Sequence, residues 1–112
     1  EEPKAGGWEV NKDYKSGKIP AEAQDAFNKA IEGQVGAEYK PVALLATQIV
    51  SGTNYALLCE ITPVVPEPET HYALVYVYES LDGKAEIVKV EDTAATSLDK
   101  VDAEAIEYSI DK

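Results

Sequence analysis

The sequence predicts an α+β fold in which one long helix packs across an antiparallel sheet of four to five strands. Residues 20–31 carry apolar side chains at helical spacing. Several later stretches alternate apolar with polar residues and are separated by turn signals. A helix with one apolar face needs a sheet against that face, because neither layer buries its apolar side alone.

The composition indicates one domain and restricts its partners. The chain has 112 residues, of which 45% are hydrophobic, enough for one core layer. Ten basic residues face 21 acidic ones, and the net charge of −11 argues against nucleic acid or anionic lipid as a partner. No apolar run approaches the roughly 18 residues of a membrane helix. The chain begins at Glu1 and lacks methionine, so we expect a trimmed mature form.

The first elements are an arm, a strand and the helix. Residues 1–7 combine charge, proline and paired glycines, which is typical of a flexible arm. Residues 8–14 fit a short strand, and we expect Trp8 to anchor it against the helix or the sheet edge. Pro20 fits the first helical position, and Gly33 and Gly36 fit the helix end. The apolar stripe of the helix consists of Ala23, Ala26, Phe27, Ala30 and Ile31.

Four further strands follow the helix. Their expected ranges are residues 42–48, 53–62, 71–79 and 84–91. Residues 63–70 hold three prolines and two glutamates and form a loop. Asp82-Gly83 predicts a two-residue hairpin turn. In the second of these strands the core-facing residues are Tyr55, Leu57, Cys59 and Ile61, by their alternation.

The chain therefore divides into an arm, residues 1–7, a domain, residues 8–91, and a C-terminal extension, residues 92–112. The extension fits either a helix or a strand. Tyr72, Tyr76 and Tyr78 alternate along one strand, on the face away from the helix. They are covered by the extension, packed against a second copy, or solvated, and we prefer the extension as their cover.

The turn between the strands 42–48 and 53–62 has unusual chemistry. Hairpin tips are normally polar, yet this one carries Ile49 and Val50 before the permissive Gly52. An exposed apolar pair indicates contact with another molecule. In the alternative, Ile49 or Val50 folds inward at an ordinary hairpin tip.

The run Thr47-Gln48-Ile49-Val50-Ser51-Gly52-Thr53-Asn54-Tyr55 is similar to the Gln-Val-Val-Ala-Gly-Xaa-Asn-Tyr run of stefins and animal cystatins. Gly6-Gly7 precedes the first strand, as the N-terminal glycine of that family does, and the predicted element order is that of the cystatin fold. Residues 6–91 thus resemble the cystatin superfamily, whose members inhibit papain-like cysteine proteases.

The resemblance implies a reversible, non-covalent, competitive inhibitor whose arm and two hairpin loops enter the protease cleft as a wedge. The implied protease-binding residues are Gly6, Gly7, Gln48, Ile49, Val50, Ser51, Gly52, Leu81, Asp82 and Gly83. Many cystatins carry Pro-Trp in the second hairpin loop, which is absent here, as the Trp is in stefins. Leu81 either replaces that contact or covers the end of the sheet. Residues 33–38 lack the asparagine of legumain inhibitors, so no legumain activity is carried over.

The other reactive residues predict no chemistry. Cys59 should face the core, where a free thiol is usually inert, and His71 has no acid–base pattern around it. We therefore expect no catalytic residues, no cofactor and no metal site, and we expect that the protein is not an enzyme. The alternative function is a non-inhibitory interaction module of a secreted or surface protein.

We expect a secreted or extracellular protein. The lone cysteine, which forms no internal disulfide, also fits a cytoplasmic, stefin-like protein. We expect a monomer, and the resemblance allows a dimer in which two chains exchange the segment around the first tip.

Overall fold

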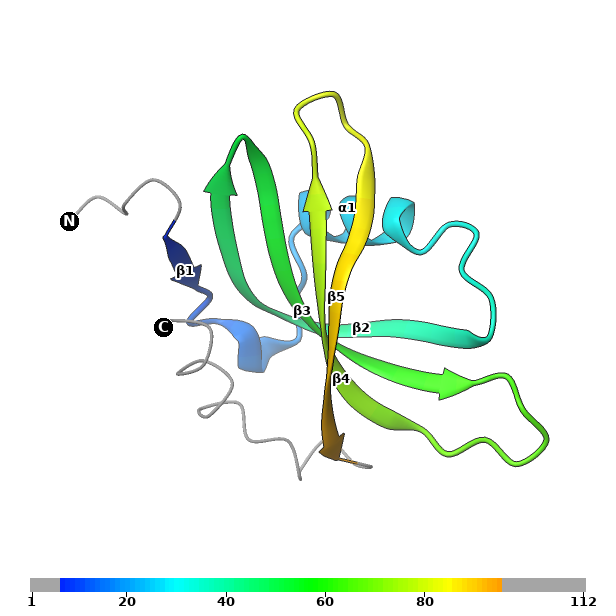
Figure 1. Ribbon diagram of the computed structural model, residues 1–112. Helices are drawn as coiled ribbons and strands as arrows, with labels where there is room; N and C mark the ends of the chain where they lie inside the picture. Colours follow the sequence, from blue (N-terminus) through cyan, green and yellow to red (C-terminus); the bar gives the residue numbers. More distant parts are fainter. Residues whose placement is uncertain (1–6, 96–112) are drawn as a thin grey trace.

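The computed structural model describes residues 7–95, which form one antiparallel five-stranded sheet and one helix (Figure 1). The elements are β1 (Trp8–Val10), the 3-10 helix η1 (Tyr14–Ser16), α1 (Ala21–Ala30), β2 (Ala37–Val50), β3 (Gly52–Pro63), β4 (His71–Glu79) and β5 (Ala85–Ala95). The strands lie in the sheet in chain order, from β1 to β5. The α+β class and the strand number are therefore confirmed.

Helix α1 buries the predicted apolar stripe, although it is shorter than predicted. Ala23, Ala26, Phe27 and Ala30 are buried. Pro20 occupies the N-cap position and α1 ends after ten residues. The helix ends one residue before the end of the predicted range, residues 20–31, and the turn that follows reaches a left-handed φ of +84° at Gly33, the residue predicted to end the helix.

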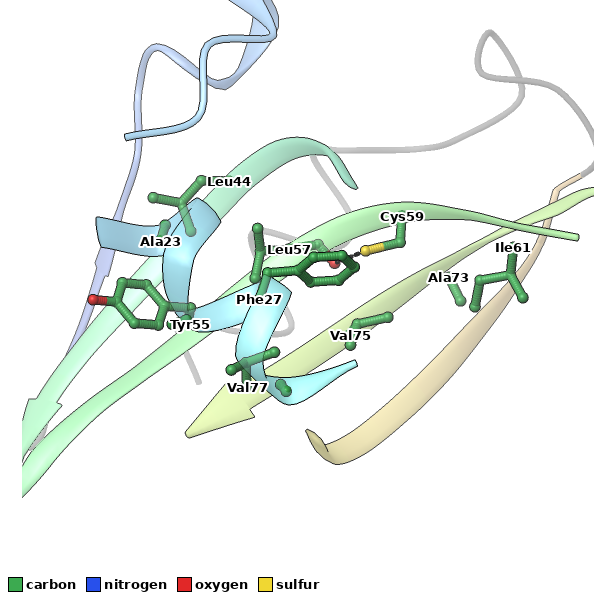
Figure 2. Packing of buried hydrophobic residues seen from close by; sticks show 12 residues of the cluster. Ala23, Phe27, Leu44, Tyr55, Leu57, Cys59, Ile61, Ala73, Val75 and Val77 are labelled. Carbon is green, nitrogen blue, oxygen red and sulfur yellow. Dashed lines mark hydrogen bonds between the residues drawn. The ribbon is translucent and has the colours of Figure 1, made fainter. Parts of the chain in front are cut away.

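The main core lies between α1 and the sheet (Figure 2). Phe27 is fully buried, and it packs in one cluster with Leu57, Val75 and Val77. The strand residues predicted to face the core are confirmed: Tyr55, Leu57, Cys59 and Ile61 all belong to this cluster. The helix thereby packs against side chains of β3 and β4.

A second apolar cluster covers the opposite sheet face. It contains Leu45, Leu58 and Leu74, with Tyr72 and Tyr76 partly buried at its margin. The tyrosines thus lie on the face away from α1, as predicted. We predicted that the C-terminal extension covers these tyrosines. From residue 96 onward the extension lies outside the described residues.

Strand β1 is shorter than expected. The predicted strand over residues 8–14 ends at Val10, because the Asn11 side chain accepts a hydrogen bond from the backbone N–H of Asp13 at 3.1 Å and forms a local turn. Trp8 contacts Tyr76 edge-to-face, with ring centroids 5.8 Å apart. This contact anchors β1 to the face opposite the helix.

Strand β5 is longer than expected. It continues through Ala95, so residues 92–95 extend the strand expected over residues 84–91. His71 at the start of β4 faces this added segment, with its Nε2 atom 3.7 Å from the Asp92 carboxylate.

Candidate functional site: three segments at one end of the sheet

The predicted binding segments lie at the same end of the sheet (Figure 1). Because the strands form an antiparallel meander, the β2–β3 and β4–β5 connections lie at the same end. Strand β1 starts there too, since Trp8 pairs with Gln48. Across the five strands runs one row of paired residues: Trp8, Gln48, Asn54, Tyr78 and Glu86. We call Gly7, residues 48–52 and residues 81–83 the tip edge.

The first hairpin tip is narrow and its apolar pair is exposed. Val50 pairs with Gly52, so Ser51 alone connects β2 to β3. The exposed fractions are 62% for Ile49 and 40% for Val50. Neither side chain folds into the core, which removes the alternative of an ordinary inward-turned tip.

Gly52 fits this tip for two separate reasons. Its φ of +111° lies in the region that side chains rarely adopt. A Cβ atom at this position would also lie 2.5 Å from the backbone oxygen of Glu79 and 2.7 Å from the Tyr78 hydroxyl. The first tip therefore approaches the end of β4 too closely for any larger residue.

Gln48 supports the hairpin from within. The Asn54 side-chain amide donates a hydrogen bond to the Gln48 side-chain oxygen at 2.8 Å, across the two strands. Both residues are half-buried. Gln48 thus lies at the base of the tip, while Ile49 and Val50 form its exposed surface.

The second hairpin differs from the predicted two-residue turn. The Gly83 N–H donates to the Ser80 carbonyl at 3.0 Å, and Gly83 has a φ of +86°. This is a three-residue loop, residues 81–83, with glycine at the left-handed position. Leu81 is 83% exposed, so it does not cover the end of the sheet. The Ser80 hydroxyl donates a hydrogen bond to the Asp82 carboxylate, and this bond lowers the pKa of Asp82.

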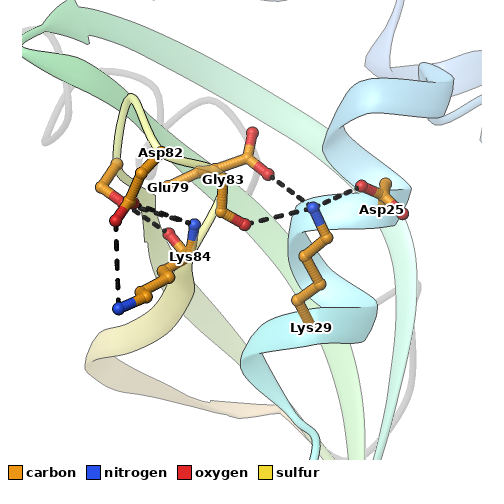
Figure 3. A network of polar contacts seen from close by, with 7 residues as sticks. Asp25, Lys29, Glu79, Asp82, Gly83 and Lys84 are labelled. Carbon is orange, nitrogen blue, oxygen red and sulfur yellow. Dashed lines mark hydrogen bonds and ion pairs between the residues drawn. The ribbon is translucent and has the colours of Figure 1, made fainter.

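Lys29 connects the second hairpin to the helix (Figure 3). Its ammonium group lies 3.2 Å from the Gly83 carbonyl oxygen, 3.5 Å from the Glu79 carboxylate and 3.1 Å from Asp25. The pKa of Lys29 is raised, first by its hydrogen bond to Asp25 and then by the Coulomb attraction of that carboxylate. The Coulomb attraction of Glu79 raises it further, but more weakly. The charge therefore stays on Lys29 at neutral pH.

Sequence reasoning missed Lys29 and the role of Tyr78. The Tyr78 hydroxyl donates a hydrogen bond to the Ser51 carbonyl. The alternation of residues in β4 predicted the sheet face on which Tyr78 lies. The only other feature of the sequence that pointed to its role was the position of Tyr78 just before the second hairpin. Of the predicted residues, Gly7 is exposed beside β1, and Gly6 lies outside the described residues.

The reactive side chains lie away from the tip edge. Cys59 is fully buried, and burial raises the pKa of its thiol to about 12, so the thiol is neutral at physiological pH. Over residues 7–95, no group of His, Cys, Asp and Glu side chains could hold a metal ion. Within the same range, no helix is long and apolar enough to cross a membrane.

No family model, curated protein or solved structure matches this chain. The function of this chain is therefore inferred from the residues and geometry of the tip edge.

Proposed function

We propose that this protein is a reversible, non-covalent, competitive inhibitor of papain-like cysteine proteases. The observation that carries the proposal is the tip edge itself. Gly7, the first tip and the second hairpin lie at one end of the sheet, and Ile49, Val50 and Leu81 are exposed there. These are the segments that the resemblance to cystatins implies as the protease-contacting wedge.

The arrangement of elements supports a cystatin-like fold. One strand precedes the helix, four antiparallel strands follow it, and the helix crosses one face of the resulting sheet. This is the element order that the family resemblance implies. The order of helix and strands along the chain thus supports both the cystatin-like fold and the inhibitory function that we propose.

The energetics of a wedge fit these residues. A nanomolar complex needs about −12 kcal/mol. Full burial of an exposed Val, Ile or Leu side chain contributes about 1.5–3 kcal/mol. Paired strands already order the first tip, so binding sacrifices little conformational entropy there. Backbone hydrogen bonds to the cleft supply further affinity.

The shape of the first tip also explains why the protease would leave it intact. A substrate peptide must lie extended through the active site. Here Val50 and Gly52 pair with each other on either side of Ser51, so the backbone reverses direction at the tip. Without an extended segment, the tip blocks the cleft without placing a peptide bond for attack.

Inhibition of papain tests the proposal. We expect the wild-type protein at sub-micromolar concentration to slow cleavage of a fluorogenic peptide, with an increase in apparent KM and no change in kcat. Val50→Asp should weaken inhibition about 100-fold or more, because it would bury an unpaired charge in the interface. No inhibition by micromolar wild-type protein would refute the proposal.

Val65→Asp provides the matched control. Val65 is 52% exposed in the β3–β4 loop at the far end of the sheet. We expect this variant to inhibit papain as the wild type does. Equal losses in Val50→Asp and Val65→Asp would indicate a general effect of added charge and would contradict a tip-edge interface.

A second candidate function is a non-inhibitory interaction module. It is favoured by another exposed apolar group at the far end: Val35, Val64 and Val65. The Val64 N–H donates to the Gly36 carbonyl at 2.9 Å, which joins the two far-end loops. An inhibitor that uses the tip edge does not need this surface. Absence of papain inhibition would favour this candidate.

A further inference from the structure

A tyrosine of the neighbouring strand supports the first tip. Tyr78, near the end of β4, donates its hydroxyl hydrogen to the backbone carbonyl of Ser51. Ser51 is the single residue between β2 and β3. The bond therefore attaches the turning point of one hairpin to a strand that belongs to the next.

The same ring occupies the space beside Gly52. A Cβ atom on Gly52 would lie 2.7 Å from the Tyr78 hydroxyl and 2.9 Å from an edge carbon of its ring. The tip thus packs against Tyr78 as well as bonding to it. Two independent contacts, one polar and one steric, fix the first tip on β4.

We propose that Tyr78 is a positioning residue that holds Ile49 and Val50 in the geometry required for protease binding, an inference that rests on the proposed function. Tyr78 acts through Ser51 and Gly52 on the side chains that meet the partner. When the Tyr78 hydroxyl is removed, the Ser51 carbonyl accepts a hydrogen bond from water instead, and the tip samples more conformations. Binding then costs more conformational entropy.

Tyr78→Phe tests this inference, because it removes the hydroxyl and retains the ring. We expect papain inhibition to weaken about 2- to 10-fold, as for the loss of one hydrogen bond. In the free protein, NMR order parameters of residues 50–52 should fall on the picosecond-to-nanosecond timescale. This second measurement requires no protease.

Tyr72→Phe is the matched control. Tyr72 lies on the same face of β4 at the far end, and its hydroxyl donates to the Glu60 carboxylate at 3.3 Å. This variant loses a hydroxyl of the same kind but should leave both inhibition and tip order unchanged. Equal effects of the two substitutions would overturn the inference, because they would reflect general loosening of β4.

The remaining outcomes separate the inference from the proposed function. Unchanged tip order in Tyr78→Phe overturns the positioning role. Greater tip motion with unaltered inhibition overturns its contribution to binding. If the wild type does not inhibit papain, the proposed function fails, and tip order alone decides whether Tyr78 positions the tip.

Discussion

Lys29 of the helix places its ammonium group 3.2 Å from the backbone carbonyl oxygen of Gly83, a residue 54 positions further along the chain. This contact fixes the second hairpin relative to helix α1. Tyr78 fixes the first hairpin by its bond to Ser51. The tip edge is thus held from two directions, by the helix on one side and by β4 on the other.

We expect Lys29→Met to loosen the second hairpin and leave the fold intact. The side chain is 43% exposed, so the melting temperature should shift by no more than a few degrees. Order parameters of residues 81–83 should fall, and papain inhibition should weaken. Lys84→Met removes the much more exposed ion pair with Asp82 and serves as the control. Identical hairpin order in Lys29→Met and wild type would contradict the tether.

We expect the two left-handed glycines of the tip edge to differ in their tolerance of alanine. Gly52→Ala should reduce the free energy of unfolding by about 2–4 kcal/mol, because backbone strain adds to a clash with the Glu79 oxygen. Gly83→Ala should cost only about 1 kcal/mol, because the nearest atom to its Cβ is the Lys29 ammonium at 3.9 Å. Urea unfolding measures both values. Equal costs would argue against close packing of the first tip on β4.

We expect stability to fall in alkaline solution because of Cys59. Burial raises the pKa of the folded thiol to about 12, whereas an unfolded thiol has a pKa of about 8.5. Above the unfolded value the unfolded chain releases a proton that the folded chain retains, so the free energy of unfolding decreases as pH rises. Between pH 8.5 and 10, ionisation of the thiol in the unfolded chain lowers the free energy of unfolding by at most about 2 kcal/mol.

Cys59→Ala isolates that contribution. Its urea-unfolding stability should depend less steeply on pH over the same range than that of the wild type. In the wild type, a thiol reagent at pH 8 should react only as fast as the protein opens, because Cys59 is fully buried. Immediate reaction of the native protein would show that the core around Cys59 is accessible.

The sequence predicted those parts of the fold that depend on local pattern. The spacing from Ala23 to Ala30 located the helix, and the alternation from Tyr55 to Ile61 identified the core face of β3. The end of β1 was misplaced because the Asn11 side chain forms a turn that competes with the strand. The helix begins one residue later than predicted, because Pro20 occupies the N-cap position, and Gly33 follows its last turn with a left-handed φ of +84°.

The candidate site was predictable only in part. Ile49 and Val50 were identified because apolar residues at a hairpin tip are unusual. The contacts of Lys29 with Gly83 and of Tyr78 with Ser51 join residues 54 and 27 positions apart. Such contacts depend on strand register and on where the helix crosses the sheet, which residue patterns do not specify.

Binding of papain to the isotope-labelled protein tests the central claim most directly. Papain with its active-site cysteine replaced by serine leaves the labelled chain intact during NMR titration. We predict that the backbone signals of residues 7, 49–52 and 81–83 shift or broaden, and that those of Val35 and Val64 at the far end do not. Perturbation confined to the far end, or no perturbation at micromolar concentrations, would contradict a protease-binding tip edge.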